Sequence, residues 1–364
     1  TPLYNIGLLQ LGQFKFLKTM EKSIYKSIPT FSLTPNRLSV YNTICKVVNN
    51  GVEKIQKISR LEKEQLLANL HGGEYTSETR WHEFKLSESG RKTMQLKINW
   101  LYFMAKSRYK KTLGGAEIYN FKINFMTLTL PAKQMHPTAE ITKNAFNQFL
   151  TEIRELYQME NYVWRIEFQK NGNVHYHLVT DTFTEFYQVQ KIWNRCLSKM
   201  GYVQEYHKKH ALMSLNDYVK SLNWSSPNSV DVKSVTSGKK IAFYISKYFG
   251  KKQDDRNPCN ELDNKDNSTG IRLWFCSRSL SKLSKISDFI EPFKFDLLSI
   301  VTAVKDTLEV IHDYCTSYFF SFSTLLPDGK EIIHKLFFSY ARGQGYVSQI
   351  NCLCRAKTST NSTK

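Results

Sequence analysis

Two histidines with a single residue between them are the side chains in this sequence best suited to chemistry. Side chains alternate between the two faces of a strand, so His175 and His177 project from the same face if this segment is extended. Asn171 and Gly172, just upstream, are typical of a tight turn between two strands, and Glu167 precedes that turn. Two imidazoles and a carboxylate on one face of a hairpin can hold a divalent metal ion.

The length of this turn decides whether Glu167 joins the histidines. A two-residue loop pairs Glu167 with Tyr176, and the carboxylate then points away from both imidazoles. A three-residue loop at 170–172 puts Gly172 in the left-handed conformation and sets Glu167 directly opposite His175. A metal site therefore predicts the three-residue loop.

The predicted metal ligands are Glu167, His175 and His177. One carboxylate and two neutral imidazoles leave positions on an ion for water and phosphate oxygens, which suits Mg²⁺ or Mn²⁺, and the imidazoles favour Mn²⁺. The alternative is a pair of histidines on a solvated strand face with no ligand role. Thr127 and Thr129 are expected to share one sheet face, where they either support the surroundings of the ion or only pack.

A second candidate group is a pair of tyrosines, Tyr244 and Tyr248, which lie one helical turn apart. A free phenol has a pKa of about 10, so its attack on a phosphodiester at neutral pH requires an activated phosphate or a neighbouring cation. Lys247 and Lys251 each stand three residues after a tyrosine. Tyrosines four residues apart are also common as core or surface pairs. Together with the metal motif they predict Tyr244, Tyr248 and Lys247 as catalytic residues that cut a nucleic-acid strand.

The charge of the chain indicates a polyanionic partner. Lys and Arg number 51 against 32 Asp and Glu, a formal net charge of +19, which favours nucleic acid or an anionic membrane surface. No apolar run approaches the roughly 20 residues that span a bilayer, so we expect nucleic acid and no membrane. The segment 99–113 holds no acidic residue and contains four basic ones, Lys106, Arg108, Lys110 and Lys111. These side chains either contact phosphates or simply cover a solvated helix surface.

Two missing motifs narrow the functional classes further. The 7 cysteines include no CxxC pair, and this indicates reduced thiols in a cytosol-like compartment rather than a zinc ribbon. The sequence also has no GxxxxGK[ST] phosphate loop, so it carries no recognisable helicase motor of its own.

The middle of the chain predicts an α+β fold with a central antiparallel sheet of about five strands and flanking helices. The apolar periodicity changes between strand-like and helix-like segments from Phe121 onward. Strands are expected at 125–130, 162–169, 174–180, 230–235 and 271–276, and helices at 138–159, 184–200 and 239–251.

The two ends of the chain are predicted to form separate regions. Residues 1–115 suggest a mostly helical, basic region, with helical spacing over 53–70. Residues 286–364 suggest a small subdomain, with a long helix at 293–313, an aromatic strand at 314–322 and a disordered basic tail.

The order of these motifs resembles that of HUH endonucleases, in particular the replication initiator (Rep) proteins of rolling-circle replication. Three segments carry the resemblance: the strand from Phe125 to Leu130, the pair His175 and His177, and the Tyr244xxLys247 helix. The tandem tyrosines are similar to those of two-tyrosine phage initiators, and the segment with Arg272, Trp274 and Arg278 resembles the one that follows their helix. The resemblance covers about 120–280 and implies an HUH domain at 116–285 with an RRM-like palm.

The resemblance implies an enzyme that nicks one strand of a replication origin. A tyrosine would keep a 5′-phosphotyrosine link and leave a 3′-OH for a host polymerase, and a second tyrosine would allow rejoining. Glu167 stands where many such proteins keep an acidic metal ligand. Single-stranded and origin DNA, a host helicase and a host polymerase are the implied partners in the host cytoplasm. Lys251, Arg272 and Arg278 join the expected DNA contacts.

Two other functions remain open from the sequence. A mobilisation relaxase or a single-strand transposase would use the same chemistry on different DNA, although the order of the motifs favours an initiator. A non-catalytic module would bind nucleic acid through the sheet, with steep salt dependence, but would never become covalently attached to DNA.

Overall fold

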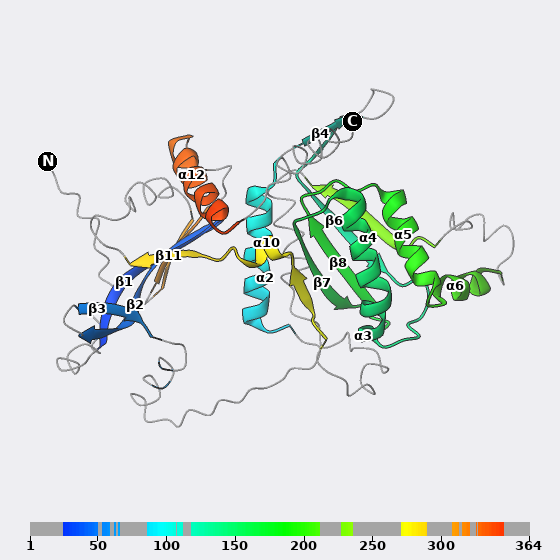
Figure 1. Ribbon diagram of the computed structural model, residues 1–364, viewed down its shortest axis with the longest axis horizontal. Helices are drawn as coiled ribbons and strands as arrows, with labels where there is room; N and C mark the ends of the chain where they lie inside the picture. Colours follow the sequence, from blue (N-terminus) through cyan, green and yellow to red (C-terminus); the bar gives the residue numbers. More distant parts are fainter. Residues whose placement is uncertain are drawn as a thin grey trace, which may run out of the picture. The chain divides into compact units, whose positions relative to one another are not determined.

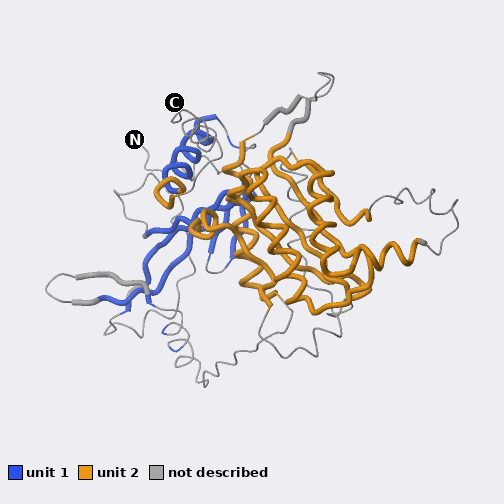
Figure 2. The backbone as a smooth tube through the Cα atoms, turned by 45° about the vertical axis from the view of Figure 1, so that its right-hand side comes forward, with its two compact units in different colours: residues 1–81, 285–340 blue, residues 82–284, 341–364 orange. Residues whose placement is uncertain are grey.

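A computed structural model of the chain separates into two compact units (Figure 2), 1–81 with 285–340 and 82–284 with 341–364. The structure describes residues 25–49, 53–58, 62, 65, 86–106, 108–111, 118–211, 227–235, 271–289, 308–312, 315–320, 325 and 327–345.

Unit 1 is built on a six-stranded antiparallel sheet. The strand order is β11-β1-β2-β13-β12, with β3 also paired to β2. A sharp turn joins β1 to β2, because Thr34 pairs with Arg37. The elements are β1 (Tyr25–Thr34), β2 (Arg37–Asn49), β3 (Glu53–Lys57), β11 (Ile286–Phe289), β12 (Leu308–His312), β13 (Cys315–Phe319) and the helix α12 (Pro327–Gly343).

These strands correct the prediction for both ends of the chain. The described part of 25–57 is strand rather than mostly helix. β3 occupies the first residues of 53–70, the segment whose spacing predicts a helix. β12 occupies the end of the predicted helix at 293–313, whereas β13 confirms the predicted aromatic strand. The physical reason is pairing between distant segments: β2 pairs with β13 across more than 250 residues, and the periodicity of a single segment cannot reveal such a partner.

Unit 2 contains the predicted five-stranded antiparallel sheet (Figure 1). The strand order is β10-β7-β8-β6-β9, and every pair of neighbours is antiparallel. The predicted α+β class and the predicted hairpin are both confirmed. The strands are β6 (Ile123–Thr129), β7 (Tyr162–Phe168), β8 (Val174–Thr180), β9 (Val230–Val235) and β10 (Trp274–Cys276).

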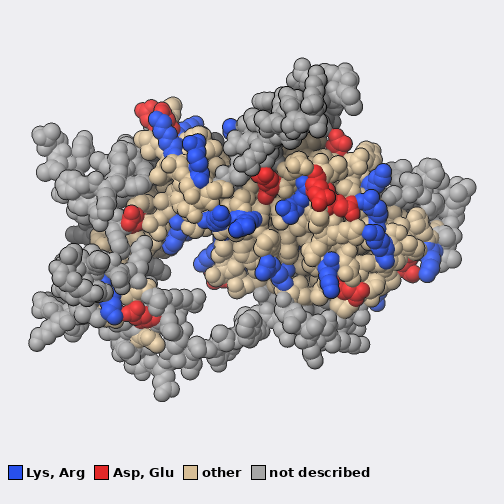
Figure 3. All heavy atoms as spheres, in the orientation of Figure 1, with Lys and Arg blue, Asp and Glu red and all other residues tan. Residues whose placement is uncertain are grey.

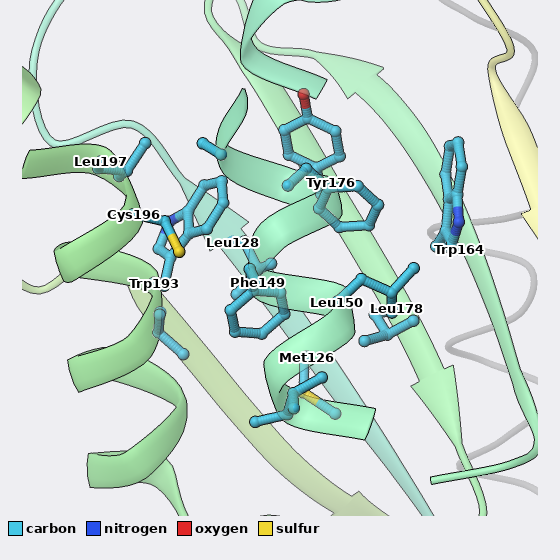
Figure 4. Close-up of a cluster of buried hydrophobic side chains, with 14 of the residues drawn as sticks. Met126, Leu128, Phe149, Leu150, Trp164, Tyr176, Leu178, Trp193, Cys196 and Leu197 are labelled. Carbon is cyan, nitrogen blue, oxygen red and sulfur yellow. The ribbon is translucent and has the colours of Figure 1, made fainter. Parts of the chain in front are cut away.

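Helices cover one face of this sheet and enclose the main core. The predicted helix at 138–159 is confirmed as α3 (Thr138–Ile141), a π-helical turn (Thr142–Phe146) and α4 (Asn147–Tyr157), and the second as α5 (Phe186–Ser198), with α6 (Tyr202–Ala211) after it. Figure 4 shows the core, where side chains from α4, α5 and the sheet pack together. Burying each large apolar side chain contributes about 1.5–3 kcal/mol. The labelled core residues are Met126, Leu128, Phe149, Leu150, Trp164, Tyr176, Leu178, Trp193, Cys196 and Leu197.

A further helix, α2 (Glu88–Met104), contacts β7 and β10. Its first turn is capped by Ser87, whose hydroxyl oxygen accepts a hydrogen bond from the Gly90 N–H at 3.0 Å. The Trp100 indole N–H donates to the Ser284 carbonyl at 3.1 Å, just beyond the short helix α10 (Arg278–Ser281). These contacts tie the segment after β10 to α2.

The helix α2 ends at Met104. The basic segment beyond it is therefore not a solvated helix surface, which was one of the two alternatives predicted from the sequence. Residues 108–111 form β4 (Arg108–Lys111), which pairs with β5 (Ile118–Phe121). Pairing of the backbone replaces the hydrogen bonds that a continuing helix would have made. Lys106 lies exposed between α2 and β4.

Two aliphatic residues on α4 give a test of this core. Ile153 is fully buried and Leu156 is 54% exposed. We expect Ile153→Ala to lower the free energy of unfolding by about 2–4 kcal/mol, because it leaves a cavity. Leu156→Ala should change it by less than about 0.5 kcal/mol. Urea denaturation of both variants checks this, and similar losses would contradict the packing of α4 on the sheet.

Candidate metal centre

The turn between β7 and β8 is the three-residue loop that a metal site requires. The Gln169 N–H donates to the Asn173 carbonyl at 2.9 Å, so these two residues close the loop. Gly172 has a φ of 79°, the left-handed conformation that glycine adopts without strain. Glu167 pairs directly with His175. The predicted register is confirmed.

Side-chain hydrogen bonds hold this loop against the segment after β6. The Gln134 N–H donates to Asn173 Oδ1 at 2.9 Å, and the Asn173 amide donates to the Ala132 carbonyl at 2.9 Å. The Val174 N–H donates to Gln134 Oε1 at 2.8 Å. Asn173 and Gln134 are both buried, so these bonds fix the start of β8, the strand that carries both histidines.

The strand pairing gathers the predicted ligands on the sheet face opposite the helical core. Tyr176, between the two histidines, is fully buried in that core, so His175 and His177 project from the other face. Thr127 pairs with His177. Glu167, opposite His175, completes the predicted set of three ligands.

Two of these ligands are in direct contact. His177 Nε2 lies 2.9 Å from Glu167 Oε2, and His177 Nδ1 lies 3.3 Å from the hydroxyl of Thr127. The two imidazole rings stack at a centroid distance of 4.6 Å. His175 Nδ1 lies 3.0 Å from the side-chain amide nitrogen of Gln169. Its other ring nitrogen, Nε2, is buried and has no hydrogen-bond partner among the described residues.

The charges of the site favour the forms that bind cations. Burial alone would raise the pKa of Glu167, but its hydrogen bond with His177 and nearby positive charge hold the pKa below its ordinary value. Burial, together with repulsion from His177, lowers the pKa of His175 to about 3. Glu167 is therefore ionised and His175 neutral near neutral pH, as metal ligands must be.

Arg165 is a neighbour of the site that the sequence analysis missed. It pairs with His177 across the β7–β8 ladder and is only 2% exposed. Burial lowers its pKa, and the Glu167 carboxylate opposes this shift. Its position two residues before Glu167 on the same strand is the signal that could have identified it.

Glu167, His175 and His177 have side chains of the chemical type that binds a divalent ion, and the distance between Glu167 and His177 also suits one. Neighbouring ligands of an octahedral ion with bonds of about 2.1 Å lie about 3 Å apart, close to the 2.9 Å between His177 Nε2 and Glu167 Oε2. As they stand, no three His, Cys, Asp or Glu in the described part of the chain form a group that could hold an ion.

Four of the remaining predicted site residues cannot be placed against this centre. Tyr244, Lys247, Tyr248 and Lys251 lie outside the described residues. The Leu273 carbonyl accepts a hydrogen bond from the Ile166 N–H, so the backbone next to Arg272 lies at the Glu167 end of the sheet.

Arg272 and Arg278 are separated by β10. The Arg272 guanidinium lies 4.9 Å from the centre of the Phe275 ring, and Arg278 begins α10 beyond the other end of the strand. Both arginines are exposed. The structure therefore does not bring them together as one binding site. The DNA-binding role of these arginines, and of Lys106, Arg108, Lys110 and Lys111, stays a prediction.

Lys and Arg side chains are spread widely over the visible face of the molecule, with Asp and Glu in smaller groups (Figure 3). This distribution suits a polyanionic partner. No helix in the described ranges has the length and apolar character needed to cross a bilayer.

A family model described as replication-associated protein ORF2/G2P matches residues 123–253. The matched stretch is somewhat more than a third of the chain, and it contains Glu167, both histidines and both tyrosines. The similarity supports a role in the initiation of replication and an interaction with DNA. Comparisons with curated proteins and with solved structures gave no match.

The turn that sets the register can be tested at Gly172. Its φ of 79° is unfavourable for a residue with a Cβ atom, so we expect Gly172→Ala to destabilise the protein by about 1–2 kcal/mol. Gly172→Asn should cost less, since asparagine tolerates this conformation. Thermal unfolding of the two variants provides the measurement. Equal losses would indicate that the backbone conformation is not what matters at this position.

Proposed function

We propose that this protein initiates rolling-circle replication by nicking and rejoining single-stranded DNA at an origin. The observation that carries the proposal is the contact between Glu167 and His177, 2.9 Å apart beside His175 on the face opposite the core. The match of 123–253 to a replication-associated family supports the biological role. Metal-dependent cleavage is the further step of this proposal, and it depends on the geometry of the site rather than on that match.

In the proposed reaction Glu167, His177 and His175 would hold a Mg²⁺ or Mn²⁺ ion. When bound, such an ion polarises the scissile phosphate and stabilises the charge that develops on it. Neutral imidazoles would supply lone pairs to such an ion, and the ionised Glu167 would supply the negative charge that retains it. Glu167 has a side-chain exposure of 26% against 4% for His177, so the carboxylate side of the site is the side that a phosphodiester could approach.

The nucleophile in this proposal is Tyr244, with Tyr248 as the second. The phenol oxygen forms a bond to the scissile phosphorus and loses its proton, and the bond from phosphorus to the 3′ oxygen breaks. The products are a 5′-phosphotyrosine and, after protonation, a 3′-OH that a host polymerase extends. Lys247 stabilises the phenolate, and Tyr248 makes the second cut that ends a round.

The partners follow from this chemistry. Single-stranded origin DNA is the substrate, and the net charge of +19 speeds encounter with it. A host helicase opens the duplex ahead of the polymerase, in the cytoplasm of the host cell.

Covalent attachment to DNA is the decisive test. Full-length protein is incubated with pooled single-stranded oligonucleotides and Mn²⁺, and a protein–DNA adduct that survives denaturation is measured on a gel. We expect the amount of adduct to fall by more than about 100-fold in His175→Ala and His177→Ala. Loss of a metal ligand should reduce activity more than loss of a residue that only hydrogen-bonds to a ligand, which typically costs about 10–100-fold. It should persist in part in Tyr244→Phe and Tyr248→Phe and vanish in the double variant.

Two matched variants control for general damage. His207 is exposed on α6, and Tyr187 is 80% exposed on α5, so His207→Ala and Tyr187→Phe should leave the adduct unchanged. If no metal and no oligonucleotide yields an adduct, the protein is a non-catalytic nucleic-acid-binding module. Transfer between transposon ends would instead identify a transposase of the same chemistry.

A further inference from the structure

Each histidine of the candidate metal centre has a side-chain partner at its Nδ1 atom that can both donate and accept a hydrogen bond. For His177 this partner is the hydroxyl of Thr127, at 3.3 Å. For His175 it is the side-chain amide of Gln169, at 3.0 Å. A hydroxyl reverses its role by rotation, and an amide does so by a half-turn that exchanges its nitrogen and oxygen.

The contacts in this structure correspond to histidines that carry their proton on Nε2. The ionised Glu167 can only accept, so His177 donates to it from Nε2. In a neutral His177 ring the Nδ1 atom then accepts from the Thr127 hydroxyl. The Gln169 amide nitrogen faces His175 Nδ1, which therefore accepts. The proton of neutral His175 is then on Nε2, which is buried and meets no hydrogen-bond partner in the part of the chain that the structure describes.

Metal binding requires the opposite arrangement. A histidine that binds a cation through Nε2 offers a lone pair there and carries its proton on Nδ1, which must donate to an acceptor. Gln169 supplies that acceptor when its amide oxygen turns toward His175, and Thr127 does so through its hydroxyl oxygen. A backbone carbonyl in either place could only accept, so it would not be compatible with a neutral histidine whose proton is on Nε2.

We infer that Gln169 is a positioning residue that decides whether His175 acts as a metal ligand, with Thr127 in the same role for His177. This inference rests on the proposed function for its ion. The amide keeps His175 Nε2 protonated without the ion, and its half-turn frees the lone pair when the ion binds.

The backbone of Gln169 closes the turn, since its N–H donates to Asn173 and its carbonyl accepts from Gly172. Its side chain can therefore be changed while the register is kept. Gln169→Glu replaces the amide with a group that only accepts, and Gln169→Met removes the hydrogen bond at similar size. Asn171→Asp is the matched control for charge, because Asn171 is exposed on the same loop and its carboxylate analogue still accepts from the Asn173 N–H.

Mn²⁺ affinity of the full-length protein is measured by calorimetry and by electron paramagnetic resonance. We expect Gln169→Met to bind about tenfold more weakly and Gln169→Glu about tenfold more tightly than the unmodified protein, the usual size of an outer-partner effect. Thr127→Val should also weaken binding. Asn171→Asp should raise the Mn²⁺ affinity much less than Gln169→Glu does. Equal gains in the two acidic variants, or unchanged affinity in Gln169→Met, would overturn the inference.

Nitrogen NMR of the histidine rings in metal-free protein separates this inference from the proposed function. The proton of His175 is expected on Nε2 in the unmodified protein and on Nδ1 in Gln169→Glu. The same tautomer in both would refute the role of Gln169, whatever the protein does to DNA. Failure of the unmodified protein to bind Mn²⁺, with the expected tautomers observed, would instead remove the proposed metal chemistry.

Discussion

The pairing of β7 with β8 is the constraint on which the candidate site depends. Side chains alternate along a strand, so a shift of one residue in this pairing would move Glu167 to the opposite face from His175 and His177. The three-residue turn prevents the shift, and it is possible because Gly172 adopts a φ of 79° without strain. A backbone conformation at the tip of a hairpin thus decides whether a carboxylate and two imidazoles meet.

The opposite face of the same strands holds the histidines in place. Tyr176, between them, stacks on Phe146 at a centroid distance of 4.3 Å and an angle of 8°. Its hydroxyl shares a 2.8 Å hydrogen bond with Thr142, the first residue of the π-helical turn. Turns of this kind often occur near functional sites. Anchoring the residue between two ligands limits how far either ligand can move, and this suits a site whose geometry must be accurate to a fraction of an ångström.

The polar face combines burial with limited access. His177 is almost fully enclosed, and Glu167 keeps part of its surface exposed. Arg165, buried on the same strand as Glu167, adds positive charge beside the carboxylate. A site of this kind strengthens electrostatic interactions by excluding water, yet leaves one side for a phosphodiester to approach. These features agree with the proposed cleavage of DNA, and Thr127 and Gln169 lie beside the two histidines on the same side of the sheet.

The sequence by itself determined the elements whose signal is local. The Asn-Gly turn, the alternation around His175 and His177, and the periodic helices at 138–159 and 184–200 each depend on neighbouring residues, and the structure confirms all of them. Even the register could be derived, because a metal site is compatible with only one loop length.

Tertiary structure alone decided what depends on distant partners. The ends of the chain form one sheet because β1 pairs with β11 and β2 with β13, and no periodicity within either end contains that information. The burial of Arg165 and the contact of the Gln169 amide with His175 also depend on the surrounding structure, although the spacing along the strand places Arg165 on the same face as Glu167. Local propensity can specify a strand or a helix, but the free energy that selects a pairing partner comes from contacts made only after folding.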